Sequence, residues 1–194
     1  PIANLAGHEG PIQSVRFNVE ATRVLTGGAD QTLRIWDAAS GKQLRSIAAH
    51  SGAVTSVLPQ ANNTRVITAG ADKTVKLWEV RLGEVIRPFT GQGGPVQAVT
   101  FAPSGTEMVS AGANGNVIVW EVATAKALRT IAHGGGAVAA VAVSPDGKQI
   151  ASVGADKNLK LWNYADGAAG PVISAFANPV QSVSYCRDGT QIAA

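Results

Sequence analysis

The four tryptophans of this chain, Trp36, Trp78, Trp120 and Trp162, follow one another at a constant interval of 42 residues. The segments around the first two, "TGGADQTLRIWD" and "TAGADKTVKLWE", also repeat a threonine and an aspartate at the same spacing. A fixed period of this length indicates one supersecondary unit copied several times. Repeats therefore have to be recognised before any single motif is interpreted as chemistry.

Each repeat contains four segments of the length of a β-strand. Examples of such segments are "EVIRPFT", "PVQAVTFA", "TEMVSAG" and "NVIVWEV", which are rich in valine, isoleucine and aromatic residues. Glycine and Asx-type turns such as "PSG", "PDG" and "RDG" separate strands of this kind. Four short antiparallel strands cannot bury both faces alone, so neighbouring repeats must stack face to face. The pattern predicts an all-β fold, a β-propeller in which each repeat forms one blade.

Composition narrows the class of protein without identifying a partner. The 194 residues are 45 % hydrophobic and 15 % charged, as in an ordinary soluble β-rich domain. No apolar run approaches the roughly 20 residues of a membrane helix, and the first residues show no targeting signal. The single cysteine, Cys186, excludes an internal disulfide and a cysteine-rich metal site. A net charge of +3 permits contact with nucleic acid without demanding it, because the basic residues are scattered.

The first repeat, "GHEGPIQSVRFNVEATRVLTGGADQTLRIWD", resembles a WD40 repeat, and the resemblance extends over essentially the whole chain. It has the Gly-His pair, a Ser/Thr before the glycines, an aspartate in the next tight turn, and then Ile-Trp-Asp. The resemblance implies a hydrogen-bonded tetrad of His, Ser/Thr, Asp and Trp inside each blade. These positions are His8, Thr26, Asp30, Trp36, His50, Thr68, Asp72, Trp78, Ser110, Asn114, Trp120, His133, Ser152, Asp156 and Trp162.

The tetrad also contains the residue types of a catalytic Ser/Thr-His-Asp set. An active site needs one constellation in a cleft, whereas this one recurs and is expected to be buried, so we favour a structural role. All three histidines of the sequence are assigned to tetrad positions, so none is left for another site. No P-loop, dinucleotide fingerprint or HExxH motif occurs. We therefore predict no catalytic, cofactor-binding or metal-binding residues. The glycosylation sequon at Asn62 is interpreted as a turn.

Two repeats depart from the pattern. The third has Gln92 in place of the histidine and Asn114 in place of the aspartate, so its tetrad is expected to be weakened or replaced by an amide network. The fourth has His133 one place early, and using it requires the "HGGGAV" loop to bulge by one residue, which its three glycines make feasible. The incomplete fifth repeat has Phe176 at the histidine position.

We divide the chain, as one partial propeller of residues 1–194, into repeats at about 5–46, 47–88, 89–130 and 131–172 and a partial repeat at 173–194. WD40 propellers resemble closed rings, most often of seven blades. We therefore expect an incomplete arc that belongs to a larger propeller, closed by a longer chain or by an oligomer. An open arc exposes a blade face and strand edges.

Binding is expected on surfaces outside the tetrads. The resemblance implies a partner-binding face formed by the loops before the first strand and after the second. Its positions here are Pro11, Gln13, Ala29, Ala53, Thr55, Ala71, Pro95, Gln97, Ala113, Ala137, Ala139, Ala155, Pro179 and Gln181. This set lacks the Trp, Tyr and Arg that usually anchor interfaces, so a smooth face that binds nothing stays an equal alternative.

A second surface is the rim. It carries Arg45, Arg87 and Arg129 with Lys42 and Lys126, and Arg34, Lys76 and Lys160 recur beside the tryptophans. Such a belt could follow phosphates, but edge protection is the favoured interpretation. Cys186 is interpreted as a small filler and not as a nucleophile.

Three functions remain open from the sequence. The first is a non-enzymatic scaffold for protein partners or for further domains of the same chain. The second is an accessory propeller segment of a larger enzyme, signalling or redox protein whose chemistry lies outside these residues. The third and weakest is nucleic-acid association through the rim. The compartment cannot be assigned.

Overall fold

The computed structural model describes residues 4–61 and 63–194. Within them every regular element is a β-strand, and none of these residues forms a helix that could cross a membrane. The chain divides into two compact units, Pro1–Thr90 and Gly91–Ala194, each of which is considered by itself. Asn62, the acceptor of the predicted glycosylation sequon, lies outside the described residues.

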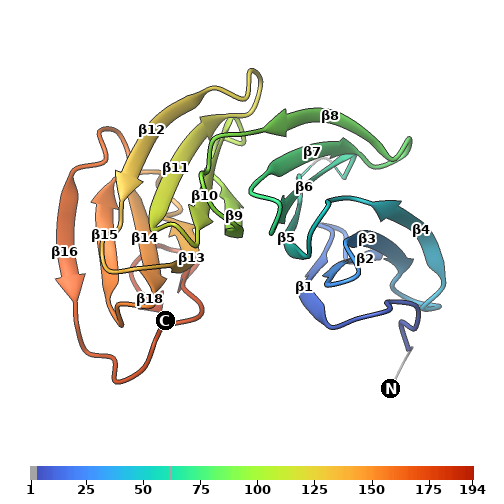
Figure 1. The fold of residues 1–194 in the computed structure, drawn as a ribbon, viewed down its shortest axis with the longest axis horizontal. Coiled ribbons are helices and arrows are strands. Elements are labelled where there is room, and N and C mark those ends of the chain that lie inside the picture. The colour runs from blue at the N-terminus through green and yellow to red at the C-terminus, as the bar shows by residue number, and fades with distance from the viewer. Residues whose placement is uncertain (1–3, 62) are drawn as a thin grey trace. The chain divides into compact units, whose positions relative to one another are not determined.

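Unit 1 consists of two four-stranded antiparallel sheets, blade 1 and blade 2 (Figure 1). Blade 1 has the order β1-β2-β3-β4, with bounds Ile12–Phe17, Arg23–Gly28, Thr32–Asp37 and Gln43–Ala48. Blade 2 repeats this order with β5 Val54–Pro59, β6 Arg65–Gly70, β7 Val75–Glu79 and β8 Glu84–Phe89. Each strand pairs with the next one along the chain, so short hairpin turns are sufficient connections.

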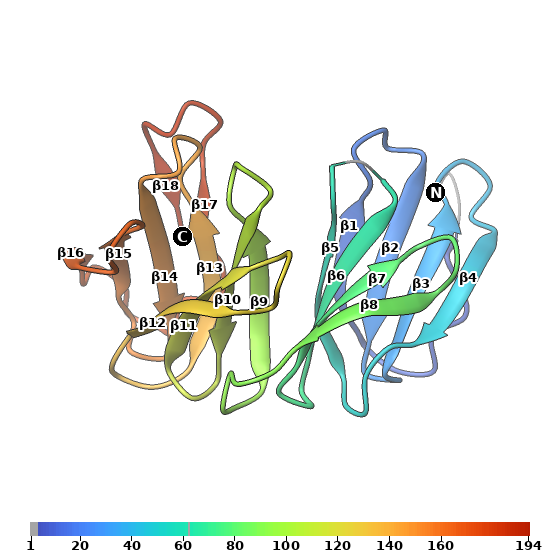
Figure 2. The ribbon, with the colours of Figure 1, turned by 90° about the horizontal axis from the view of Figure 1, so that it is seen from above.

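Unit 2 contains blade 3, blade 4 and a terminal hairpin (Figure 2). Blade 3 is formed by β9 Val96–Phe101, β10 Glu107–Gly112, β11 Asn116–Glu121 and β12 Ala127–Ala132. Blade 4 is formed by β13 Val138–Val143, β14 Gln149–Gly154, β15 Leu159–Asn163 and β16 Ala169–Ile173. The hairpin pairs β17 Ser184–Tyr185 with β18 Ile192–Ala193. The predicted all-β fold of four-stranded antiparallel blades is confirmed.

The turn between the second and third strands of each blade has one backbone requirement. The residue after the Asp or Asn is Gln31, Lys73, Gly115 or Lys157, and its φ is 68°, 69°, 82° or 63°, respectively. These values lie in the left-handed region, where glycine has no steric cost. Gly115 therefore preserves the turn of blade 3 although the surrounding side chains have changed.

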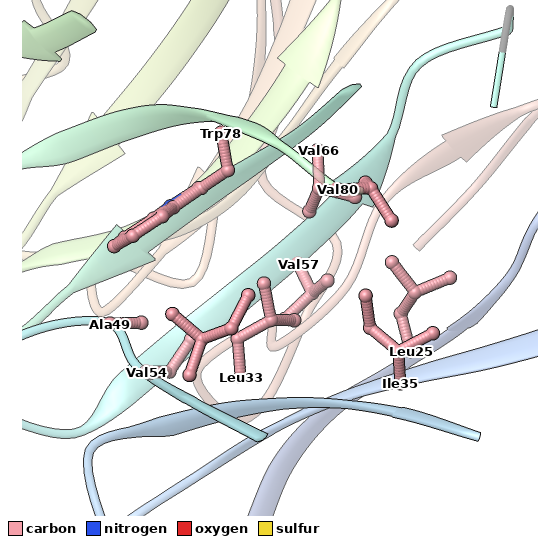
Figure 3. Packing of buried hydrophobic residues seen from close by; sticks show 10 residues of the cluster. Leu25, Leu33, Ile35, Ala49, Val54, Val57, Val66, Trp78 and Val80 are labelled. Carbon is pink, nitrogen blue, oxygen red and sulfur yellow. The ribbon is translucent and has the colours of Figure 1, made fainter. Parts of the chain in front are cut away.

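Apolar side chains join the two blades of unit 1 (Figure 3). Leu25, Leu33 and Ile35 of blade 1 belong to one buried cluster with Val54 and Val57 of blade 2. All five are at most 2 % exposed. Removal of this much apolar surface from water favours face-to-face stacking of the blades, as the strand pattern predicts. A second such cluster in unit 2 joins blade 3 to blade 4 and includes Val109, Val119, Val141 and Ile150.

The other face of blade 1 is open in unit 1. Val15 and Phe17 are 51 % and 60 % exposed, whereas Val57, at the position equivalent to Val15, is fully buried against blade 1. Exposed apolar faces of this kind favour association. The expectation that a further blade or a partner covers this face stays a prediction.

Candidate functional site

The tetrad residues of blade 2 form a continuous chain of hydrogen bonds. The indole Nε1 of Trp78 lies 2.8 Å from Thr68 Oγ1, and Thr68 Oγ1 lies 2.7 Å from His50 Nε2. On the other side of the ring, Nδ1 lies 2.9 Å from Asp72 Oδ1. Strands β6 and β7 supply the threonine and the tryptophan, and the loops at one end of the blade supply the histidine and the aspartate.

Elementary donor and acceptor chemistry fixes the direction of these bonds. The indole can only donate, and an ionised carboxylate can only accept. His50 Nδ1–H therefore donates to Asp72, which leaves Nε2 as the acceptor of the Thr68 hydroxyl proton. Thr68 in turn accepts from Trp78. Within this tetrad each of these polar groups has a partner, which a buried network requires.

Blade 1 has the same arrangement. His8 Nε2 lies 2.6 Å from Thr26 Oγ1, and Trp36 Nε1 lies 2.9 Å from that oxygen. His8 Nδ1 lies 2.8 Å from Asp30 Oδ2. The hydroxyls are inaccessible, since Thr26 is 2 % and Thr68 0 % exposed. In this geometry neither hydroxyl can attack a substrate carbonyl as a nucleophile, because the substrate cannot reach it.

A cation four residues after the aspartate completes three of the four networks. Arg34 lies 3.4 Å from Asp30, Lys76 4.0 Å from Asp72, and Lys160 2.6 Å from Asp156. Lys76 and Lys160 also donate to backbone carbonyls at 2.7 Å. The assignment of these three cations to a basic belt is therefore wrong, because their charges are used inside the blades. The i, i+4 spacing from each aspartate was the signal for this role.

Burial and hydrogen bonding set the protonation states of the blade 2 network. Desolvation lowers the pKa of His50 below its ordinary value of 6.5, although Asp72 acts in the opposite direction. Burial alone would raise the pKa of Asp72, but hydrogen bonds from Thr74 and the Ser51 backbone, together with His50, lower it overall. A neutral imidazole beside an ionised carboxylate is thus the favoured state at neutral pH. This state agrees with the donor and acceptor roles derived above.

Blade 4 uses His133 with its ring nitrogens exchanged. Nδ1 lies 2.8 Å from Ser152 Oγ, and Nε2 lies 3.1 Å from Asp156 Oδ1. Trp162 Nε1 donates to Ser152 at 2.7 Å. Since the carboxylate accepts, Nε2 carries the proton here, so the tautomer is opposite to that in blades 1 and 2. The one-residue shift of this histidine is accommodated by the following Gly134–Gly136 segment, whose φ values are 71°, 86° and 109°.

Blade 3 replaces the imidazole by an amide network. Ser110 Oγ accepts from Trp120 at 2.7 Å and donates to Gln92 Oε1 at 2.6 Å. Gln92 Nε2 then donates to the Asn116 carbonyl at 2.9 Å, and the Asn114 amide donates to the Gln92 carbonyl. Ile118 stands where the other blades carry the cation. The acid, the titratable ring and the cation are thus lost together, so the hydrogen-bond network that replaces the tetrad in blade 3 has no titratable side chain.

The positions of the implied partner-binding face come together in pairs at the tetrad end of the blades. In each blade a backbone N–H after the second strand donates to a carbonyl before the first. These bonds join Ala29 to Pro11, Ala71 to Ala53, Ala113 to Pro95 and Ala155 to Ala137, at 2.8–2.9 Å. The register between the first two strands shifts next to each pair. The residues left out of the pairing are Gln13, Thr55, Gln97 and Ala139.

Each of these four residues therefore lies in a β-bulge of its own blade. A β-bulge changes the direction of side chains and is frequent beside functional sites. None of the twelve positions in blades 1 to 4 is buried. Pro179 and Gln181 are also exposed. Most side chains on this face are small, because nine of the twelve residues are proline or alanine. Such side chains do little to shield the adjacent backbone.

Cys186 holds a turn. Its Sγ lies 2.8 Å from Asp188 Oδ1 and accepts the Gln191 backbone N–H at 2.9 Å. Ser144, 42 residues earlier, makes the same two contacts with Asp146 and Gln149. The thiol thus replaces a turn serine. Among residues 4–61 and 63–194 no group of three or more His, Cys, Asp or Glu side chains is placed to hold a metal ion.

The family model WD40, described as "WD domain, G-beta repeat", matches residues 1–37, 41–79, 83–121 and 125–163. These segments cover most of the chain, and the chain belongs to the WD40 repeat family. This confirms the resemblance found in the sequence. The family is generally a non-catalytic interaction domain.

Curated relatives match over about one repeat. The serine-threonine kinase receptor-associated protein of Dictyostelium discoideum is 41 % identical over 46 residues, 24 % of this chain and 16 % of that protein. Eukaryotic translation initiation factor 3 subunit I of Phaeosphaeria nodorum is 42 % identical over 45 residues, 23 % of this chain and 14 % of that protein. The periodic tryptophan protein 2 homolog of Schizosaccharomyces pombe is 46 % identical over 39 residues, 20 % of this chain and 5 % of that protein.

Proposed function

We propose that this chain is a non-enzymatic scaffold that binds protein partners at the tetrad end of its blades. The observation that carries the proposal is that each blade has a buried polar network next to accessible loops. The His, Ser/Thr, Asp and Trp side chains satisfy one another inside, while the bulge and the paired loops next to them stay accessible. Small side chains let a partner approach the backbone closely, and the rigid networks hold the loops in place.

The names of two relatives support the same class of function. A receptor-associated protein and a subunit of an initiation factor are, by name, members of assemblies. Each aligned part spans less than a fifth of the relative, so a shared partner does not follow. Attachment to a larger enzyme or signalling protein is compatible with the scaffold proposal.

Ion pairs among the described residues weigh against nucleic-acid association. Arg34, Lys76 and Lys160 are directed to aspartates, and Arg129 lies 3.5 Å from Glu107. These pairs leave fewer cations on the rim to displace counterions from a phosphate backbone.

The test of the scaffold proposal is affinity capture from native extract with Ala29→Glu and Ala71→Glu combined. Two carboxylates on the face should remove the proteins that the unmodified chain captures, because charge without a partner is costly at an interface. The matched control carries Ala39→Glu and Ala123→Glu, in the turns at the opposite end of blades 1 and 3. The control should capture the same proteins as the unmodified chain. Equal capture by all three proteins, or no capture by any, would contradict the proposal.

A further inference from the structure

A basic groove lies within unit 1, at the end of blades 1 and 2 opposite the partner-binding face. Its volume is about 850 Å³, which is within the range of ligand-binding clefts. Its lining includes Arg23, Arg45, Arg65 and Arg81, with the half-exposed Leu44 and Leu82 between them. The groove thus combines an apolar surface with four guanidinium groups.

The positive charge of this groove is largely unbalanced. Glu79 is the one acidic residue in its lining, and its Oε1 accepts the Arg81 backbone N–H at 3.3 Å. Arg45 donates to the carbonyls of Arg81 and Leu82 at 2.7 and 3.3 Å. Arg23, Arg65 and Arg81 are exposed, and their guanidinium groups make no ion pair with any residue in the described part of unit 1.

The equivalent position in unit 2 is filled by the protein itself. Two repeats later, Glu107 stands for Arg23, Arg129 for Arg45 and Tyr164 for Val80. Tyr164 donates its hydroxyl to Glu107 Oε2 at 2.6 Å, and the Arg129 guanidinium lies 5.4 Å from the tyrosine ring centroid. Arg129 also lies 3.5 Å from Glu107. A carboxylate and an aromatic ring therefore neutralise and cover this arginine from within.

We propose that the basic groove of unit 1 binds an acidic peptide segment that contains an aromatic residue. The peptide supplies from outside the carboxylate and the ring that Glu107 and Tyr164 supply in unit 2. Guanidinium groups pair with carboxylates in a bidentate geometry and also stack on aromatic faces. Leu44 and Leu82 provide apolar contact for the ring. No aromatic side chain is in the groove lining to stack nucleobases, so the peptide is favoured over single-stranded nucleic acid.

The filled site of unit 2 also suggests the variant that tests the proposal. Arg23→Glu combined with Val80→Tyr places in unit 1 the two residues that fill the site in unit 2. This protein should occupy its own groove and lose the peptide. Arg16→Glu makes the same charge change on exposed β1, outside the groove lining, and is the matched control.

The experiment is fluorescence anisotropy with the labelled peptide Glu-Glu-Tyr-Glu-Glu and the whole chain. The double variant should weaken binding by about tenfold or more, a loss of about 1.4 kcal/mol or more, while Arg16→Glu leaves the dissociation constant nearly unchanged. If the double variant does not fold, as judged by tryptophan fluorescence, Arg81→Glu on the exposed rim of the groove replaces it. No binding to the unmodified chain, or equal weakening by Arg16→Glu, would overturn the proposal.

Competitors distinguish a built site from general attraction of anions. Inorganic phosphate and oligo(dT) should displace the labelled peptide only at much higher concentrations than the unlabelled peptide. Equal displacement by oligo(dT) would assign the groove to nucleic acid and overturn the peptide proposal. The variant with Ala29→Glu and Ala71→Glu should bind the peptide normally, so failure at this groove and failure at the partner-binding face are separable.

Discussion

Thr68→Val is expected to lower the free energy of unfolding by about 2–6 kcal/mol, because each of the two buried groups it leaves unpaired costs about 1–3 kcal/mol. Thr68 is fully buried and is the one link between the Trp78 indole and the His50 ring. Valine has nearly the same shape, so packing is retained while the indole N–H and His50 Nε2 lose their partner. Urea unfolding followed by tryptophan fluorescence measures the change.

Thr130→Val is the matched control for this experiment. Thr130 lies in β12 with its side chain exposed, and the substitution removes the same hydroxyl from a strand. It should change stability by at most about 0.5 kcal/mol. If both substitutions have equally small effects, the hydrogen-bonded tetrad does not hold blade 2 together.

Gly70→Ala is expected to cost about 1–3 kcal/mol, the usual range for overpacking a close-packed site. A Cβ at this position would overlap His50 Nδ1 and lie 2.6 Å from Cγ of the same ring and 2.7 Å from Asp72 Oδ1. The φ of Gly70 is not in the left-handed region, so the cost comes from collision with the ring and not from backbone strain. The ring has to move, and its bonds to Thr68 and Asp72 lengthen. Thermal unfolding by circular dichroism measures the loss.

Gly10→Ala controls for the loss of backbone freedom that both substitutions share. A Cβ at Gly10 would make only an ordinary contact of 3.4 Å with Ala29. This protein should be as stable as the unmodified chain or slightly more stable, because alanine reduces the entropy of the unfolded state. A melting temperature for Gly70→Ala equal to that of Gly10→Ala would show that the His50 ring is not fixed in place.

The repeat period was sufficient to predict the blades and to align their equivalent residues. Four tryptophans at one spacing fix the register of every strand, since each repeat is a copy of the same hairpins. The positions of the implied partner-binding face could also be aligned by the period. The backbone hydrogen bonds from Ala71 to Ala53 and from Ala113 to Pro95 recur at this spacing. Their role in binding stays a prediction.

The finer features of the site could not be predicted from the period. A one-residue shift of His133 is visible in the sequence, but the exchange of its ring nitrogens depends on where Ser152 and Asp156 lie in space. The periodic cations were assigned to the rim because their distance from the aspartates was unknown. The basic groove was missed because Arg23 and Arg65 become neighbours of Arg45 only when blades 1 and 2 stack.

The direction of the hydrogen bonds is the central claim, and the tautomers of the histidines test it most directly. Nitrogen-15 NMR of the imidazole rings should show at pH 7 that His50 carries its proton on Nδ1 and His133 on Nε2. Burial lowers the pKa of both rings below 6.5. Both should therefore stay neutral as the pH falls below 6.5, and the stability they contribute, complete above that pH, should be lost as the pH approaches the lowered values. The same tautomer for both rings, or titration of either near pH 6.5, would contradict the account.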